Sequence, residues 1–170
     1  NVGIGTTVPG NKLEIAGGIS ATGINGFISS PYAIVAPKTP IGIGTGLLTP
    51  IGTVATGTGP YGVAVHPTGR FAYVANFSAP TVQTYTINQA TGGLTSLETD
   101  VTGTNPVRVA VDPKGRFAYV LNRGSATVQT FTIDQSTGGL TLLEADATGS
   151  TPLELAVDPT GRFVYVANSF

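Results

Sequence analysis

One stretch of fourteen residues occurs three times in this chain at a constant spacing. Residues 63–76, Val-Ala-Val-His-Pro-Thr-Gly-Arg-Phe-Ala-Tyr-Val-Ala-Asn, return with few changes at 109–122 and again at 155–168. The offset is 46 residues both times, without a gap. A repeat of this length is typical of a protein built from one structural unit that stacks on copies of itself.

Each repeat contains four short runs of strand-forming residues. In the second repeat these runs are 107–111, 116–122, 127–133 and 140–147. They are rich in Val, Thr, Phe, Tyr, Leu and Ile, and turn residues such as Asp112-Pro-Lys-Gly115 separate them. Four antiparallel strands per repeat are the pattern of a β-propeller blade. We therefore predict an all-β fold of four-stranded antiparallel blades, with about three blades' worth of strands per chain. The phenylalanines at equivalent positions should be buried; these are Phe71, Phe117 and Phe163.

The strand order predicts where each blade begins and ends. A half-blade with the third and fourth strands spans 31–57, and there we align Tyr32–Ile34 with Tyr85–Ile87. Further along the chain come two whole blades and a half-blade with the first two strands: 58–103, 104–149 and 150–170. Residues 1–30 are expected to form an extended, fibre-like segment. Either neighbouring chains complete each other's half-blades, or the sequence is part of a longer propeller.

Composition excludes several classes of function. Charged residues make up 10% of the chain and the net charge is −1, so a basic surface for nucleic acid is absent. No apolar run approaches the ~20 residues of a membrane-spanning helix, so we expect no membrane insertion. The chain has no Cys and no Met, which rules out a cysteine metal site. This lack of oxidisable sulfur suits an exposed protein, and we expect an extracellular or cell-surface location.

Two sets of motifs resemble known families. The stretch Arg-Phe-Ala-Tyr-Val-x-Asn, followed by Thr-Val-Gln-Thr-(Tyr/Phe)-Thr-Ile and Thr-Gly-Gly-Leu-Thr, resembles the Tyr-Val-x-Asn β-propeller repeat over residues 46–170. That repeat occurs in microbial surface proteins and in lactonase-like seven-bladed propellers. The run Val2-Gly-Ile-Gly-Thr-Thr-Val-Pro9 resembles a motif of phage tail fibres and bacterial surface stalks. The resemblance implies a blade, but propellers host many activities.

Groups that could carry chemistry mostly recur with the repeat. His66, the only histidine, stands where the other repeats have Asp112 and Asp158, which marks it as a turn residue. Because repeated carboxylates are architectural more often than catalytic, we predict no catalytic, cofactor or metal site and no enzymatic activity. The exception is Arg108 and Glu154, which share one position on the innermost strands. They predict either an ion pair that tunes blade packing or a polar channel site for a small anion or sugar.

The function hypothesis from these observations is a structural or adhesive subunit of an extracellular fibre, filament or surface assembly. Its copies would form a homo-oligomer, joined head to tail by strand complementation into a filament or a ring. The residues expected at the contact between subunits are Val2, Ile4, Tyr32, Ile34, Leu48, Phe163, Tyr165 and Val166. Two alternatives stay open: a propeller module that binds glycans or a host surface, and a fragment of a longer lactonase-like propeller enzyme.

Overall fold

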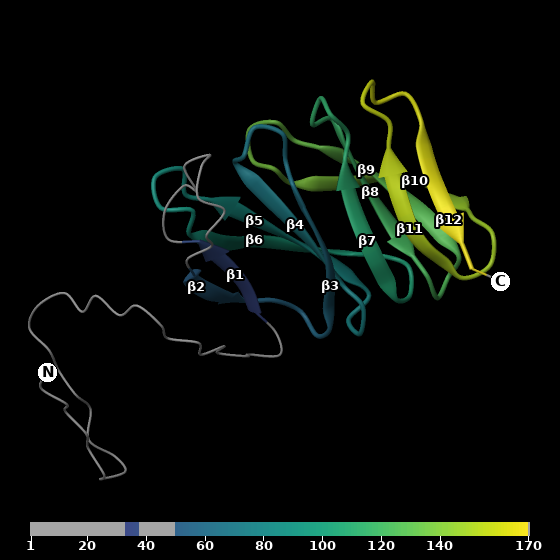
Figure 1. Cartoon of the computed structure of the whole chain (residues 1–170), viewed down its shortest axis with the longest axis horizontal. Helices are drawn as coiled ribbons and strands as arrows, with labels where there is room; N and C mark the ends of the chain where they lie inside the picture. Colours follow the sequence, from purple (N-terminus) through teal and green to yellow (C-terminus); the bar gives the residue numbers. More distant parts are fainter. Residues whose placement is uncertain (1–32, 38–49, 170) are drawn as a thin grey trace, which may run out of the picture.

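A computed structural model describes residues 33–37 and 50–169 of the chain, and every regular element in them is a β-strand. The strands form four antiparallel sheets that lie in a row (Figure 1). The first sheet pairs β1 (Ala33–Pro37) with β2 (Pro50–Ala55), and the last pairs β11 (Pro152–Val157) with β12 (Val164–Asn168).

The two central sheets have four strands each, connected in sequence order. Blade 1 consists of β3 (Pro60–Val65), β4 (Phe71–Asn76), β5 (Thr81–Ile87) and β6 (Leu94–Val101). Blade 2 consists of β7 (Pro106–Val111), β8 (Phe117–Asn122), β9 (Thr127–Ile133) and β10 (Leu140–Ala147). This architecture confirms the predicted fold class of four-stranded antiparallel propeller blades. The proposed extended segment 1–30 lies outside the described residues, and the domain boundaries stay a prediction.

The first sheet shows that the alignment of its third-strand segment was wrong. In β1, Ala33 pairs with Ala55 and Pro37 pairs with Pro50. One repeat later, the residues equivalent to Ala55 and Pro50 are Val101 and Ser96. These two residues pair with Thr81 and Tyr85. Pro37, and not Tyr32, therefore holds the place of Tyr85. Placing Tyr32 at the position of Tyr85 would need a connection to Pro50 seven residues longer than that from Tyr85 to Ser96, whereas the connection from Pro37 to Pro50 is only two residues longer.

The largest core lies between blades 1 and 2. One face of blade 1 packs against the opposing face of blade 2. The members of this cluster are Phe71, Tyr73, Ala75 and Val82 from blade 1 and Val109, Ala118, Val120, Phe131, Ile133 and Leu140 from blade 2. Alternate residues of a strand point to opposite faces, so each blade buries one face against the blade before it and one against the blade after it.

The asparagine of the Tyr-Val-x-Asn motif holds together the end of each blade. Asn76 and Asn122 are completely buried, and each donates from Nδ2 to a threonine hydroxyl at the start of the next strand, Thr81 (3.1 Å) or Thr127 (3.3 Å). A Cβ at Gly57 would lie 2.6 Å from Asn76 Nδ2. The motif is therefore conserved between repeats for packing, because the loop that enters each blade passes directly over this amide.

The equivalent phenylalanines differ in burial, so the expectation that all three are buried is wrong in part. Phe71 is 3% exposed, Phe117 is half-buried and Phe163 is 52% exposed. The difference follows from the next blade: the turn between β9 and β10 covers Phe71, and a Cβ at Gly138 would overlap its ring. The described residues contain no later turn of this kind to cover Phe117 or Phe163.

Candidate functional site

Three strands lie side by side: the first strand of blade 1, the first strand of blade 2 and the first strand of the last sheet (β3, β7 and β11; Figure 1). They are the inner strands of the propeller arrangement. A Cβ at Gly62 would lie 2.8 Å from the carbonyl oxygen of Val107 and 2.9 Å from the Cα of Arg108. Since any side chain there would collide with β7, glycine is what permits β3 to approach β7 so closely.

The residues equivalent to Gly62 on β7 and β11 are Arg108 and Glu154, and they form an ion pair. The Nε of Arg108 donates to both carboxylate oxygens of Glu154, at 2.9 Å each. Arg108 Nη1 also donates to the carbonyl of Val107 at 3.0 Å, and the backbone N–H of Leu155 donates to Glu154 at 3.2 Å. The side chains are 33% and 57% exposed, so solvent reaches the pair. Whether it forms a channel site for a ligand stays a prediction.

An exposed tyrosine extends this pair on the side of blade 1. The Arg108 guanidinium lies 5.5 Å from the centroid of the Tyr61 ring, and Tyr61 packs against Phe77 with ring centroids 5.8 Å apart. Tyr61 is 63% exposed. The sequence-based prediction did not include Tyr61. The signal was present, because the residues at the same repeat position, Val107 and Leu153, are aliphatic and Tyr61 is aromatic. In the described part of the chain Arg108 Nη2 has no hydrogen-bond partner, so the cluster offers free N–H donors next to an aromatic ring.

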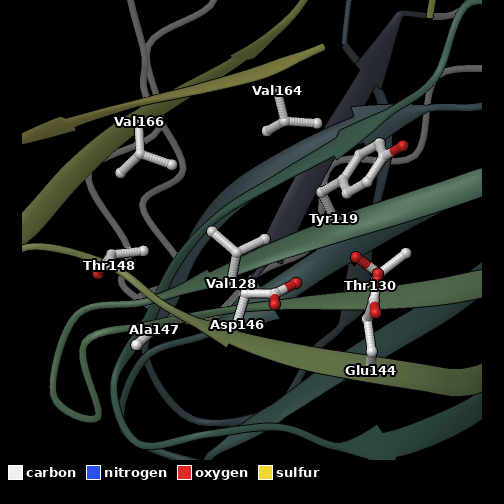
Figure 2. A pocket seen from close by; sticks show the side chains of 9 residues that line it. All are labelled: Tyr119, Val128, Thr130, Glu144, Asp146, Ala147, Thr148, Val164 and Val166. Atoms are coloured by element: carbon white, nitrogen blue, oxygen red, sulfur yellow. The ribbon is translucent and has the colours of Figure 1, made fainter. Parts of the chain in front are cut away.

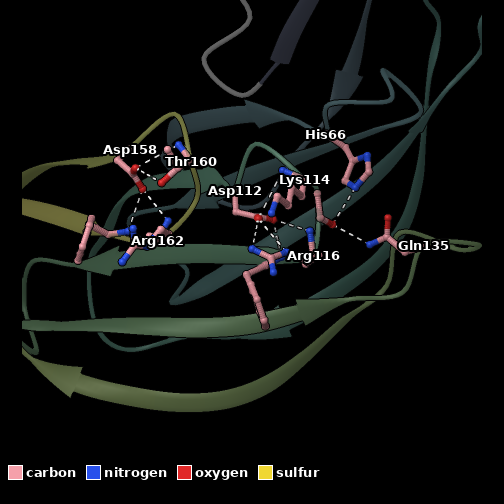
Figure 3. Close-up of polar contacts among 11 residues, drawn as sticks. His66, Asp112, Lys114, Arg116, Gln135, Asp158, Thr160 and Arg162 are labelled. Atoms are coloured by element: carbon pink, nitrogen blue, oxygen red, sulfur yellow. Dashed lines mark hydrogen bonds and ion pairs between the residues drawn. The ribbon is translucent and has the colours of Figure 1, made fainter.

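His66 is a buried connection between two turns (Figure 3). Its Nε2 lies 2.9 Å from the carbonyl oxygen of Gly115, which can only accept, so Nε2 carries the proton. Its Nδ1 then accepts from the backbone N–H and the hydroxyl of Thr68, at 3.3 and 2.8 Å. With both nitrogens engaged and 2% of the residue exposed, the imidazole has a structural role.

The equivalent Asp112 fixes its own turn. Its carboxylate is completely buried and accepts from the backbone N–H groups of Arg116 and Phe117 and from the Arg116 guanidinium, with Nη2 at 2.9 Å (Figure 3). Burial alone would raise the pKa of Asp112, but these hydrogen bonds outweigh burial and hold the pKa below its ordinary value. The third equivalent, Asp158, makes similar turn contacts on the surface.

A groove runs between the outer strands of blade 2 and β12 (Figure 2). Its residues are Tyr119, Val128, Thr130, Glu144, Asp146, Ala147, Thr148, Val164 and Val166. The described residues contain no group of three or more His, Asp or Glu side chains placed to hold a metal ion. They also contain no helix long and apolar enough to cross a membrane.

The residues expected at a contact between subunits fall into two sets. Val2, Ile4, Tyr32 and Leu48 lie outside the described residues, and Ile34 lies in β1. Phe163 and Tyr165 are 52% and 62% exposed, whereas Val166 packs against the core between blade 2 and β11. Their role in association stays a prediction.

Comparison with known proteins places the chain among propellers. Residues 44–169 match the family model described as lactonase, 7-bladed beta-propeller. The solved structures that resemble the chain include the periplasmic gluconolactonase of Pseudomonas aeruginosa, with 31% identity, a TM-score of 0.61 and coverage of 68% of this chain and 35% of that one. A Bacteroides fragilis protein provisionally named a 6-phosphogluconolactonase has 30% identity and a TM-score of 0.61, covering 64% of this chain and 32% of that one. A Lactobacillus plantarum protein has 27% identity and a TM-score of 0.68, covering 72% and 39%. Among curated proteins no match was found.

These matches change two expectations. The chain spans between 32% and 39% of the length of these structures, which favours a piece of a longer lactonase-like propeller over a fibre subunit. The prediction of no enzymatic activity is wrong at the level of the family, because the matched family and the relatives at 30% and 31% identity are named for lactonase activity. The resemblance to phage tail fibres at residues 2–9 finds no support in these matches. The chain belongs to the lactonase, 7-bladed beta-propeller family.

Proposed function

We propose that this chain supplies part of the channel of a propeller enzyme that binds and hydrolyses sugar lactones. The observation that carries the proposal is the ion pair of Arg108 and Glu154 on adjacent inner strands, beside the exposed ring of Tyr61. Family membership supports the reaction class, and the relative from Pseudomonas aeruginosa is named for gluconolactone. The sequence alone had suggested a small anion or sugar for the same position.

The cluster offers groups suited to each part of a lactone. In hydrolysis, water adds to the carbonyl carbon, the ring C–O bond breaks and the released oxygen takes a proton, so the product is a hydroxy acid. Negative charge develops on the carbonyl oxygen during this step. The Nη2 group of Arg108 is available to stabilise that charge and later the carboxylate of the product. The ring of Tyr61 offers an apolar face for the sugar.

Glu154 acts as a positioning residue in this proposal. Its carboxylate holds the Nε side of the guanidinium at 2.9 Å, and it is itself held by the Leu155 N–H. Fixing the guanidinium in this way orients the free Nη2 before the substrate binds, which lowers the cost of ordering a long side chain.

The test is hydrolysis of glucono-1,5-lactone, followed by proton release and corrected for the spontaneous rate. We expect Arg108→Ala to lower kcat/KM about a hundredfold, because an oxyanion donor typically contributes on that order. Arg123→Ala is the matched control, because Arg123 is an exposed arginine on the loop after β8. The activity of this variant should equal that of the wild type. Wild-type turnover no faster than the spontaneous reaction, or equal activity in Arg108→Ala, would contradict the proposal.

We also propose that the protein works outside the cytoplasm. The absence of Cys and Met supports this location, and the relative from Pseudomonas aeruginosa is periplasmic. Fractionation of the native host, with the protein detected by antibody, tests this part of the proposal separately from activity.

A further inference from the structure

Phe77 breaks the repeat next to Tyr61. The other two repeats have Arg123 and Ser169 at this position, so blade 1 differs from them in having an aromatic residue there. Phe77 is half-buried, and the centroid of its ring lies 5.8 Å from that of Tyr61. The Tyr61 ring in turn lies beneath the Arg108 guanidinium. Two aromatic residues that the equivalent positions lack therefore meet beside the arginine of the inner-strand cluster.

Phe77 provides the surface on which the Tyr61 side chain rests. Tyr61 is 63% exposed, and within the part of the chain that the structure describes its hydroxyl has no hydrogen-bond partner. Its ring contacts are those with Phe77 and Arg108. Because an exposed side chain can occupy several rotamers, the direction of the Tyr61 ring depends on the group against which it packs.

Three contacts fix Phe77 itself. Its backbone N–H donates to the carbonyl of Gly59 at 2.7 Å, and its own carbonyl accepts from Nδ2 of Asn105 at 3.3 Å. Its ring packs against the apolar cluster of blade 2 that includes Val107. Since two of these contacts come from blade 2, Phe77 is held in place relative to the blade that contains Arg108.

The amide of Asn105 is specific to this junction between blades. Asn105 has a φ of 51°, and the equivalent residues Gly59 and Thr151 have φ of 68° and 49°. The left-handed backbone is thus common to all three repeats, and forming it does not require an amide. A Cβ at Gly124 would overlap Oδ1 of Asn105, so glycine there leaves room for the amide. The hydrogen bond to Phe77 is therefore a feature of one junction and not of the repeat.

We infer that Asn105 and Phe77 are positioning residues for the proposed lactone site. They hold the ring of Tyr61 at 5.5 Å from the Arg108 guanidinium. The apolar face for the sugar and the donor for the carbonyl oxygen are then in place before the substrate binds, which lowers the cost of ordering them. This role rests on the proposed function, and it makes the junction of blades 1 and 2 a determinant of substrate affinity.

Replacing Asn105 by glycine tests this role, because glycine keeps the left-handed backbone and removes the amide. We expect Asn105→Gly to raise KM for glucono-1,5-lactone about fivefold at unchanged kcat, since an aromatic contact stabilises bound substrate and transition state alike. Phe77→Leu, which keeps an apolar side chain at this position, should raise KM by a similar factor. Thr151→Gly is the matched control: it makes the same change at the equivalent backbone position and should leave both constants unchanged.

A second readout follows the geometry without substrate. The ring current of Tyr61 shifts the side-chain Hδ and Hε signals of Arg108 upfield in NMR spectra of the labelled 170-residue chain. Tyr61→Leu gives the positions of these signals without the ring. We expect Asn105→Gly to move the Arg108 signals toward those positions and Thr151→Gly to leave them in place.

The outcomes separate this role from the proposed function. An active wild type whose KM and Arg108 signals stay the same in both Asn105→Gly and Phe77→Leu would overturn the inference. A fall in kcat at constant KM would also overturn it, because that result indicates loss of folded enzyme and not loss of positioning for binding. Wild-type turnover no faster than the spontaneous reaction would overturn the proposed function, and with it the assignment of these residues to a lactone site, even if the Arg108 signals respond.

Discussion

Replacing Phe71 by alanine should lower the free energy of unfolding by about 3–5 kcal/mol. The ring is 3% exposed and lies in the core between blades 1 and 2, beneath the turn that contains Gly138. Removing it leaves a cavity that the rigid turn cannot fill. Chemical denaturation followed by circular dichroism measures the loss.

The equivalent substitutions provide the controls for this prediction. Phe117→Ala should cost less, because Phe117 is half-buried, and Phe163→Ala should cost least, because that ring is 52% exposed. The order follows from the cover that each ring receives from the next blade. Three equal losses would mean that the rings are buried by their own blades and that the account of packing between blades is wrong.

Replacing Asp112 by alanine should lower the free energy of unfolding by about 3 kcal/mol. The substitution removes the acceptor for the N–H groups of Arg116 and Phe117 and for the Arg116 guanidinium. The N–H groups of this partly buried turn lose their acceptor, and hydrogen bonds to a charged group are among the stronger ones. Thermal and chemical denaturation at neutral pH measure the effect.

The pH dependence of this loss has a definite sign. The pKa of Asp112 is lower in the folded chain than in the unfolded chain, so the stabilisation is complete above the unfolded pKa of about 3.9. It disappears as the pH falls through the lower, folded pKa. The difference between wild type and Asp112→Ala should therefore be constant above about pH 5 and shrink below about pH 4. Asp158→Ala, at the less buried equivalent position, should be less destabilising. A difference that grows in acid would contradict the assignment.

The repeat made most of the fold predictable. A 46-residue period with four short runs per unit specifies strands, turns and blades, because each unit must bury both faces against its copies. The β1 alignment failed because it relied on Tyr32, whereas pairing in the structure follows the Ala55 end of β2. The burial of Phe117 could not be predicted from its own repeat, since the turn that covers a phenylalanine at this position belongs to the following repeat, as Gly138 does for Phe71.

The candidate site was predictable only in part. Arg108 and Glu154 were found because they break the repeat at a position where the first repeat has glycine. Tyr61 differs from Val107 and Leu153 in a similar way, but as one of the apolar positions that flank Gly62 it was not singled out. The prediction of no enzymatic activity relied on the lack of a catalytic histidine or a converging pair of carboxylates, and the family match overturned it. The proposed role of Arg108 as an oxyanion donor requires neither group within this chain.

We propose that ligands bind at the inner-strand cluster of Tyr61, Arg108 and Glu154. The most direct test is a titration of the isotopically labelled chain with gluconate, the product expected from the lactone, followed by amide chemical shifts in two-dimensional NMR. We expect saturable shifts at these three residues and at Leu155, no shifts on the outer strands β6 and β10, and loss of the shifts in Arg108→Ala. Shifts confined to the groove beside β12, or an unchanged titration in Arg108→Ala, would contradict it.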